Sequence, residues 1–218
     1  CIRDSYHGAR KETIHPFDFA VKEGETIGVI GGTGSGKSTF VSLIARLYDV
    51  TSGRILYRGV DEKELKPEFI RGKIGFVPQK ASLFEGSLRD NMKWGKEDAT
   101  DEEIYQALDI AQAREFVDQK EQGLDFRIEQ NGGNLSGGQK QRLTIARALV
   151  RKPEILILDD SASALDFATD ARLRKAIKEN TDNMTVFLVS QRVSTIRNAD
   201  HILVLDDGNI DGIGTHLQ

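Results

Sequence analysis

The sequence has little cysteine, no cluster of basic residues and no long apolar run. Its 218 residues contain one cysteine, Cys1, which excludes an internal disulfide and favours a reducing compartment. Thirty basic residues stand against 34 acidic ones, so nucleic acid is an unfavoured partner. Nothing approaches 18 consecutive apolar residues, which argues against a membrane-spanning helix within these residues. Repeats and low-complexity tracts are also lacking.

The length leaves room for one large domain, or for one domain with a subdomain, and for a substantial core. The chain is therefore long enough to be an enzyme. It starts at Cys1, without methionine or the layout of a signal peptide, and stops at Gln218. We expect it to be cut from a longer protein.

Short apolar runs predict a core built on a sheet. Residues 1–30 and 53–58 alternate in a way that is typical of antiparallel strands joined by turns. Further strands are expected at residues 73–77, 155–158, 185–189 and 202–205. The run 155–158 is continuously apolar, as expected for a central parallel strand that is covered on both faces.

The pattern becomes helical between about residues 84 and 150, and strand signals vanish there. Thr100 and Glu103 form a capping box that opens a helix with Ile104, Leu108 and Ala111 on one face. We predict an α/β fold with a mostly parallel sheet, an antiparallel β subdomain and an inserted helical subdomain. The core covers 1–83 and 151–218, and the helical insert covers 84–150, entered near Gln79 and left through the helix that starts at Ser136.

The segment 27–39 carries the pattern Gly-x-x-x-x-Gly-Lys-Ser directly after an apolar strand. Glycines allow a concave loop whose N–H groups point inward, and the helix that follows adds its N-terminal dipole. Lys37 would reach the β- and γ-phosphates of a nucleotide, while Ser38 would ligate Mg²⁺. The alternative, a glycine-rich turn before an ordinary helix, fits this context poorly. The candidate nucleotide-binding residues are Gly32, Thr33, Gly34, Ser35, Gly36, Lys37, Ser38 and Thr39.

A second glycine-containing motif, Leu-Ser-Gly-Gly-Gln at 135–139, opens a helix that runs to Val150 and is stopped by Lys152-Pro153. Ser136 and Gln139 have capping-box spacing, and capping alone would make this an ordinary helix start. Gly137 and Gly138 weaken the helix by about 1 kcal/mol each. They make sense if the backbone must approach a phosphate closely.

Together these two motifs resemble those of ABC-type ATPases, and the resemblance covers nearly the whole chain. It identifies 155–160 as Walker B, with Asp159 as a Mg²⁺ ligand. It identifies Val77-Pro78-Gln79 as the Q-loop, whose glutamine contacts Mg²⁺ and the attacking water, although a lone loop glutamine is more often merely solvated. Residues 163–166, ending in Asp166, match the D-loop, which touches the opposite protomer in this family. Tyr6 lies where the family places an aromatic ring on adenine; the alternative is a core aromatic.

Two positions depart from the family pattern. Asp160 stands where the family carries the glutamate that acts as general base, and Gln191 stands where it carries the switch histidine. With Gln79, these are the candidate catalytic residues. Two departures in one site suggest a site that binds ATP and hydrolyses it slowly, and a protomer that lends its intact signature to a heterodimer.

Residues 82–91 resemble the exporter branch of the family, which implies fused or associated transmembrane domains, a second nucleotide-binding domain, the cofactors ATP and Mg²⁺, and a place at the cytoplasmic face of a membrane. In this family each ATP lies between the Walker loop of one protomer and the signature of the other. Two alternatives stay open. One is a soluble ABC protein acting on DNA or the ribosome, although coiled-coil inserts and tandem cassettes are lacking. The other is a regulatory module that binds ATP without hydrolysing it.

Overall fold

The computed structural model describes residues 2–4, 14–161, 163–181 and 183–215. Its contacts divide the chain into two compact units. The first unit comprises 1–76, 154–160 and 183–218, and the second comprises 77–153 and 161–182. The expected helical insert, 84–150, falls inside the second unit, which also includes a helix that the sequence placed in the core. Among the described residues, no helix is both long and apolar enough to cross a membrane.

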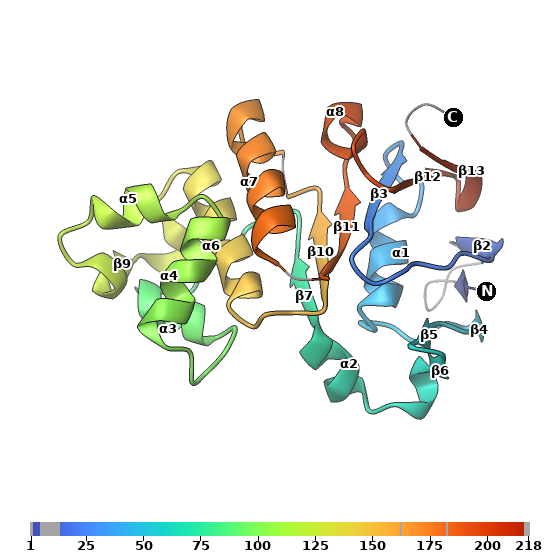
Figure 1. Cartoon of the computed structure of the whole chain (residues 1–218), viewed down its shortest axis with the longest axis horizontal. Coiled ribbons are helices and arrows are strands. Elements are labelled where there is room, and N and C mark those ends of the chain that lie inside the picture. Colours follow the sequence, from blue (N-terminus) through green and yellow to red (C-terminus); the bar gives the residue numbers. More distant parts are fainter. Residues whose placement is uncertain (1, 5–13, 162, 182, 216–218) are drawn as a thin grey trace. The chain divides into compact units, whose positions relative to one another are not determined.

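A six-stranded sheet forms the centre of the first unit, in the order β13-β12-β3-β11-β10-β7 (Figure 1). β12, β3, β11 and β10 run parallel to one another, whereas β13 returns antiparallel along β12. This mostly parallel α/β arrangement confirms the predicted fold class. The strands are β3 (Thr26–Gly31), β7 (Ile74–Val77), β10 (Ile155–Asp159), β11 (Thr185–Val189), β12 (His201–Asp206) and β13 (Asn209–Gly214).

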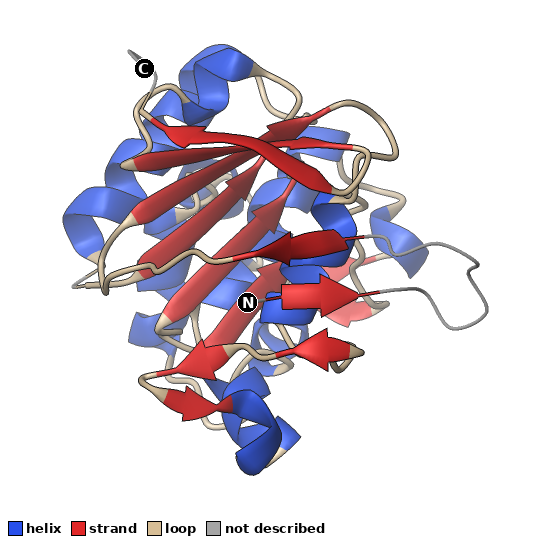
Figure 2. Ribbon diagram, turned by 90° about the vertical axis from the view of Figure 1, so that its right-hand side faces the viewer, coloured by secondary structure: helices blue, strands red, loops and turns tan. Residues whose placement is uncertain are grey.

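The other expected antiparallel strands form small sheets beside this one (Figure 2). The prediction was wrong for 26–30, because β3 runs parallel to both β11 and β12 in the central sheet. β1 lies between β2 and β4, and both pairings are antiparallel. β5 and β6 make a separate two-stranded ribbon. The bounds are β1 (Ile2–Asp4), β2 (Ile14–Phe17), β4 (Ser52–Gly53), β5 (Leu56–Tyr57) and β6 (Val60–Asp61).

Apolar residues of the sheet pack against α1 (Lys37–Ile44) to make the core of the first unit. Ile27 and Val29 of β3 are fully buried, and Phe40 of α1 contacts the ring of Phe187 at 6.4 Å between centroids. The continuous apolar run of β10 is buried on both faces, as its sequence predicts. The helix that follows the phosphate loop is thereby fixed against the sheet. The other helices of this unit are η1 (Glu62–Glu64), α2 (Pro67–Lys73) and α8 (Val193–Ile196).

The second unit is mainly helical, and two of its helices begin at the predicted caps. Thr100 and Ser136 both form complete capping boxes. Ile104, Leu108 and Ala111 are fully buried, which confirms the predicted face of α4. The helices are α3 (Leu88–Lys93), α4 (Asp101–Ile110), α5 (Arg114–Asp118), η2 (Gly123–Asp125), η3 (Gln130–Gly132), α6 (Gly137–Leu149) and α7 (Phe167–Asn180). One short strand pair, β8 (Gly86–Ser87) with β9 (Arg127–Ile128), interrupts the region where no strand was expected.

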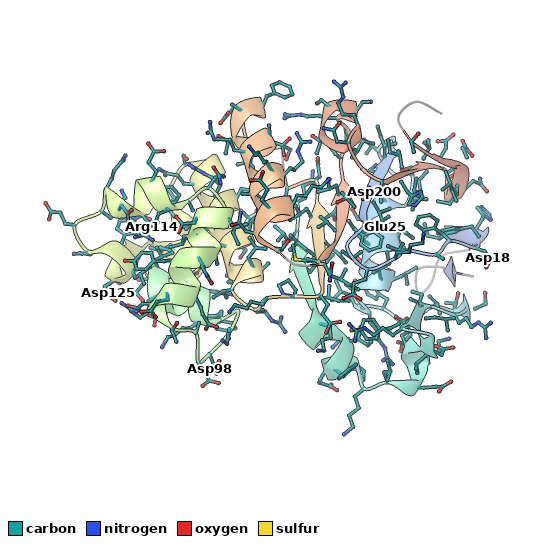
Figure 3. The ribbon with its side chains drawn as sticks, viewed as in Figure 1. Asp18, Glu25, Asp98, Arg114, Asp125 and Asp200 are labelled. Carbon is teal, nitrogen blue, oxygen red and sulfur yellow. The ribbon has the colours of Figure 1, made fainter. Side chains whose placement is uncertain are left out.

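Ion pairs tie the surface of the second unit together. Arg89 of α3 pairs with Asp101 at the start of α4 and with Asp125 of η2, the latter at 3.0 Å. Arg114, labelled in Figure 3, pairs with Asp118 one turn along α5, at 2.7 Å. Since these pairs are largely exposed, each adds little stability alone. The pairs of Arg89 join α3 to α4 and η2, whereas the pair of Arg114 stays within α5.

Glu62 is a buried carboxyl in the first unit. Only 1% of its surface is exposed, and its Oε1 atom has no hydrogen-bond partner among the described residues. Burial raises the pKa of Glu62 to about 7, although the charge of Arg46 acts in the opposite direction.

This raised pKa predicts a pH dependence of stability. Because the folded state binds the proton of Glu62 more tightly, its contribution is complete below about pH 4.5 and is lost as the pH rises through about 7. Relative to Glu62→Gln, the unfolding free energy of the parent should fall by about 1–3 kcal/mol across this window. Denaturant titrations at both ends measure the effect, and equal pH slopes in the two proteins would contradict it.

Candidate functional site

The phosphate loop spans 31–36 between β3 and α1, and its glycines are required by geometry. A Cβ atom on Gly31 would lie 2.2 Å from the carbonyl oxygen of Leu205 and 2.5 Å from Ser35 Oγ. Gly36, the N-cap of α1, has a φ of 98°, which only glycine adopts easily. Cβ atoms on Gly32 and Gly34 would meet no atom of the described chain within 4 Å. The loop is thus packed on one side and open on the other.

Lys37 is held over this loop by hydrogen bonds to it. Its Nζ atom donates to the carbonyl oxygens of Gly31 (2.8 Å) and Gly32 (2.6 Å) and to Ser35 Oγ (3.3 Å). Only 9% of Lys37 is exposed. The N-terminus of α1 has no side-chain cap. Its first-turn N–H groups and the lysine charge together suit an anion with several oxygen atoms.

Ser38 and Asp159 lie next to each other in the first unit. Ser38 Oγ donates to Asp159 Oδ1 over 3.3 Å, and Asp159 is buried at the end of β10. Burial raises the pKa of Asp159, while the Ser38 hydrogen bond lowers it. A hydroxyl and a carboxylate are hard oxygen donors. This set fits Mg²⁺, which is bound by one or two protein oxygens together with phosphate and water.

A cation held by protein side chains alone would need more ligands than this pair supplies. Across the described ranges no group of three or more His, Cys, Asp or Glu residues could hold a metal ion. The donor set therefore fits a metal that arrives with a phosphate ligand rather than a resident structural ion.

The parallel register brings the carboxyl ends of three strands to one edge of the sheet. Asp159 pairs with Val189, and Val189 pairs with Val29, directly before the phosphate loop. The backbone N–H of Asp160 donates to the Val189 carbonyl over 2.9 Å, and that of Ser190 donates to Val29 over 3.1 Å. Loops at this edge are where open α/β sheets bind ligands.

Two of the predicted catalytic residues follow these strand ends. Asp160 is half-buried and has a φ of 46°, a left-handed conformation that aspartate tolerates better than most residues. Gln191 is exposed and follows Ser190, whose Oγ accepts from the N–H of Arg192 over 3.0 Å. Ser190 thus shapes the turn that presents Gln191. The sequence analysis missed this residue, although a serine before a turn is a usable signal.

The signature motif lies in the second unit at the start of α6. Ser136 Oγ accepts from the Gln139 N–H (3.2 Å), and Gln139 Oε1 accepts from the Ser136 N–H (3.0 Å). Both side chains are therefore occupied by capping. A Cβ atom on Gly137 would enter open space, whereas one on Gly138 would lie 3.3 Å from the Ala164 carbonyl oxygen. The two glycines have different roles: Gly138 allows close packing, and Gly137 leaves the helix end accessible.

The remaining candidates have separate surroundings. Asp166 caps α7, because its carboxylate accepts from the backbone N–H and the hydroxyl of Thr169 at 2.9 and 2.7 Å. These hydrogen bonds lower the pKa of Asp166. Gln79 is exposed directly after β7, in the second unit. Tyr6 lies outside the described residues, so its assignment stays a prediction.

The first unit is a nucleotide-binding domain of the P-loop class, because its glycine loop joins a parallel strand to a helix beside the buried aspartate that ends β10. The sequence model of the ABC transporter family matches residues 14–163. The chain belongs to this family.

Individual relatives agree with this membership. The ABC transporter ATP-binding protein YfiB of Bacillus subtilis is 47% identical over 95% of this chain and 36% of its own length. YheI of the same organism, described as a probable multidrug resistance ABC transporter ATP-binding/permease protein, is 42% identical over 98% of this chain and 37% of its own. The structure of a bacterial Atm1-family ABC exporter with ATP bound superposes with a TM-score of 0.94 at 35% identity, over 99% of this chain and 38% of that one. This chain thus spans little more than a third of these relatives.

Proposed function

We propose that this chain is the ATP-binding and ATP-hydrolysing domain of an ABC exporter. The observation that carries this proposal is the meeting, at one sheet edge of the first unit, of the phosphate loop, Lys37, the Ser38–Asp159 pair and the turn before Gln191. The loop would bind the phosphates through backbone N–H groups and Lys37. Ser38 and Asp159 would hold Mg²⁺, whose chemistry is to neutralise charge on the phosphates. Calorimetric titration with ATP, with and without Mg²⁺, tests the binding step, and heat that does not depend on Mg²⁺ would overturn the metal assignment.

The proposed working unit is a head-to-tail dimer in which the signature completes the site of a second protomer. The open surroundings of Gly137 support this assignment, because the helix end there is uncovered by the described chain. Its first-turn N–H groups suit the γ-phosphate of a nucleotide held by the other protomer. Asp166 would belong to the same face.

Gly137 and Gly138 offer a test of this arrangement. Gly137→Asp should reduce steady-state ATP hydrolysis on the order of a hundredfold, because a carboxylate would oppose the incoming phosphate. ATP binding to the monomer should be unchanged. Gly138→Ala is the matched control for packing, since its added Cβ atom would press on the Ala164 carbonyl instead. Equal loss of monomer binding and hydrolysis in Gly137→Asp would mean that the signature serves its own protomer.

We propose that ATP is hydrolysed slowly at this chain's own site. Asp160 is shorter than the glutamate of the family pattern, and Gln191 stays neutral where a histidine can become cationic. A base must reach its water within hydrogen-bond distance, and a shorter side chain does so less well. We therefore infer that this protomer retains ATP and lends its signature to a faster site in a heterodimer.

We propose that a surface of the second unit contacts the transmembrane part of the exporter. Phe84 and Trp94 stack at 4.5 Å between ring centroids, and 43% and 71% of their surfaces are exposed. Arg147 lies 5.3 Å above the Phe84 ring. Exposed aromatic pairs with an arginine are typical of binding surfaces. The ATP-binding/permease name of YheI supports a transmembrane partner.

Trp94 reports on this contact because it is the only tryptophan of the chain. In a longer protein that includes the transmembrane part, with every other tryptophan replaced by phenylalanine, the fluorescence emission of Trp94 should shift to shorter wavelength, since burial removes water from the indole. Phe84→Ala should weaken the shift, and Phe69→Ala, an exposed aromatic of the first unit, is the control. Identical emission with and without the transmembrane part would contradict docking at this pair.

The second candidate function is that of a regulatory module that binds ATP without hydrolysing it. Only the residue types at Asp160 and Gln191 favour it. Single-turnover hydrolysis separates the two: conversion of bound ATP on any measurable scale excludes the module. A soluble ABC protein that does not act in transport would lack the contact of Trp94.

A further inference from the structure

The segment 82–87 carries Phe84 of the exposed aromatic pair to the surface of the second unit. Leu83, directly before it, is buried, whereas 43% of Phe84 is exposed. Residues 81–84 belong to no helix or strand. Backbone N–H and carbonyl groups need hydrogen-bond partners when they are shielded from water, so this segment must find partners other than those of a helix or a sheet.

Asn91 of α3 supplies these partners from its side chain. Its Oδ1 atom accepts from the Phe84 N–H over 2.9 Å, and its Nδ2 atom donates to the Phe84 carbonyl over 2.9 Å. A third hydrogen bond runs from Nδ2 to the Ser87 carbonyl over 3.0 Å. The orientation of the amide follows from these partners, because its oxygen can only accept and its nitrogen can donate twice. One side chain thus pairs both main-chain groups of Phe84.

The burial of Asn91 shows how closely it is fitted to this place. Only 1% of it is exposed, and Leu88 and Met92 of the same helix are fully buried. A buried amide costs free energy unless it is hydrogen-bonded, and an apolar side chain would fill the same space without that cost. The three hydrogen bonds offset the cost, and what they fix is the backbone at Phe84.

The fixed segment is joined to the helix that holds it by the aromatic stack. Trp94 is the C-cap of α3, the helix that carries Asn91. The rings of Phe84 and Trp94 lie 4.5 Å apart between centroids, with 27° between their planes. Arg147 of α6 supports the segment as well, because its Nη2 atom donates to the Ser82 carbonyl over 2.7 Å.

We propose that Asn91 is a positioning residue for docking, which fixes the backbone of Phe84 so that the Phe84–Trp94 stack is formed before the transmembrane part binds. The inference rests on the proposed contact of this aromatic pair with the transmembrane part of an exporter. A preformed surface loses less conformational freedom on binding than a flexible segment does, and therefore binds more tightly. Without the hydrogen bonds of Asn91, Phe84 would leave the stack.

Asn91→Asp tests this role, because a carboxyl group imitates the amide only while it is protonated. The protonated group accepts from the Phe84 N–H and donates to the Phe84 carbonyl, whereas the ionised group sets a bare oxygen against the Phe84 and Ser87 carbonyls. Burial raises the pKa of such a carboxyl above its usual value of about 4. We expect the stack to be kept at about pH 5 and lost at about pH 8, on either side of this raised pKa.

The readout is the ¹⁹F NMR signal of 5-fluorotryptophan, which reports on Trp94 alone because the chain has one tryptophan. The parent defines the stacked signal, and Phe84→Ala defines the unstacked one. Between the two pH values, the signal of Asn91→Asp should move more than half of the way from the first to the second. Asn91→Leu is similar in size and cannot form the hydrogen bonds, so it should give the unstacked signal at both.

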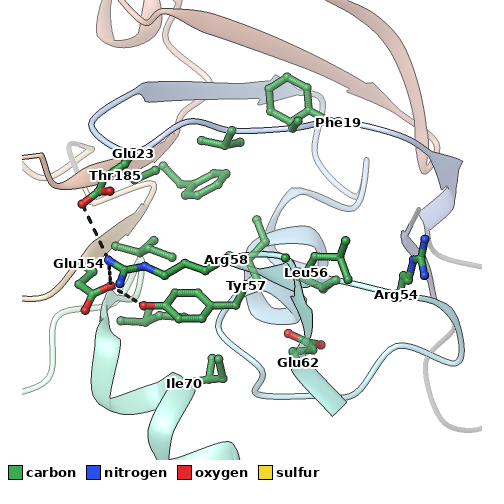
Figure 4. Close-up of a pocket in the computed structure, with 18 of the residues that line it drawn as sticks. Phe19, Glu23, Arg54, Leu56, Tyr57, Arg58, Glu62, Ile70, Glu154 and Thr185 are labelled. Carbon is green, nitrogen blue, oxygen red and sulfur yellow. Dashed lines mark hydrogen bonds and ion pairs between the residues drawn. The ribbon is translucent and has the colours of Figure 1, made fainter. Parts of the chain in front are cut away.

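Two controls separate this response from other titrations. The parent is measured at both pH values, because burial raises the pKa of Glu62 in the first unit to about 7 (Figure 4). Asn180→Asp adds a carboxylate at the exposed end of α7 and should keep the stacked signal. The proposal is overturned if Asn91→Asp matches the parent at both pH values, if it is unstacked at both, or if Asn91→Leu keeps the stack.

Docking is measured separately in a longer protein that includes the transmembrane part, with every other tryptophan replaced by phenylalanine. There, at about pH 8, Asn91→Asp should lose most of the shift of Trp94 emission that the parent shows, because its carboxyl is ionised. Retention of the full shift would overturn the role of Asn91 in docking. A parent without any shift would contradict the proposed contact instead, while the ¹⁹F signal would still decide whether Asn91 places Phe84.

Discussion

Lys37→Ala is expected to weaken ATP binding by at least about a hundredfold, or about 3 kcal/mol, while the domain stays folded. The lysine places a full positive charge over the phosphate loop through its contacts with Gly31, Gly32 and Ser35. Charge-assisted hydrogen bonds contribute about 1.5–3 kcal/mol each, and the ammonium can make more than one with a triphosphate. The backbone N–H groups remain, so residual binding should persist.

Calorimetry with ATP and Mg²⁺ measures this loss, and circular dichroism checks the fold. Lys66→Ala is the matched control, because Lys66 is exposed and precedes α2 rather than α1. Lys37→Arg keeps the charge but not the compact shape of the ammonium, and it should be intermediate. If Lys37→Ala binds ATP as tightly as the parent, then Lys37 has been misassigned.

Asp160→Glu combined with Gln191→His is expected to speed single-turnover hydrolysis at this chain's own site by roughly a hundredfold. A catalytic group displaced by about 1 Å can cost that much in rate, and the aspartate carboxylate is withdrawn by about one methylene. The histidine adds a cation where glutamine supplies only a neutral donor. The two changes should act together, since both groups face the same phosphate in the proposed mechanism.

The backbone at Asp160 adds a cost to this experiment. Its φ of 46° lies in the left-handed region, where a longer side chain is disfavoured by about 1 kcal/mol. Thermal stability of Asp160→Glu should therefore fall slightly even as the rate rises. Asp160→Asn is the control, because asparagine tolerates the same backbone and cannot act as a base. The assay uses a dimer whose other site is disabled. A parent rate of hydrolysis equal to that of the double variant would contradict the proposal of a slow site.

Local signals in the sequence were sufficient for much of the fold. The capping boxes at Thr100 and Ser136 and the apolar run of β10 depend on neighbours a few residues apart, and each element formed as predicted. The hairpin of β12 and β13 turns at Asp207-Gly208, a dipeptide that is a local signal for such turns. The β8–β9 pair joins residues about forty positions apart, so no local pattern marks it.

In the candidate site, too, some features depend on local sequence and others on contacts between distant segments. The loop and Lys37 follow from a motif whose chemistry is local. The packing of Gly138 against Ala164 does not follow from a local motif, because it depends on how α6 meets the segment before α7. Likewise, α7 contacts α4 and joins the second unit, whereas its amphipathic pattern would suit either unit. Asp166 looked like a residue for a partner protomer, yet it also caps its own helix.

The hydrogen bonds of Lys37 to its own loop set a threshold for ligands. An incoming anion competes for the ammonium with two carbonyl oxygens and one hydroxyl. A ligand with one phosphate or one carboxylate group brings all its oxygens on a single centre and replaces fewer of these contacts. A polyphosphate offers several oxygens at once and can replace more of them. The loop should therefore favour ligands that carry several phosphate groups in a row.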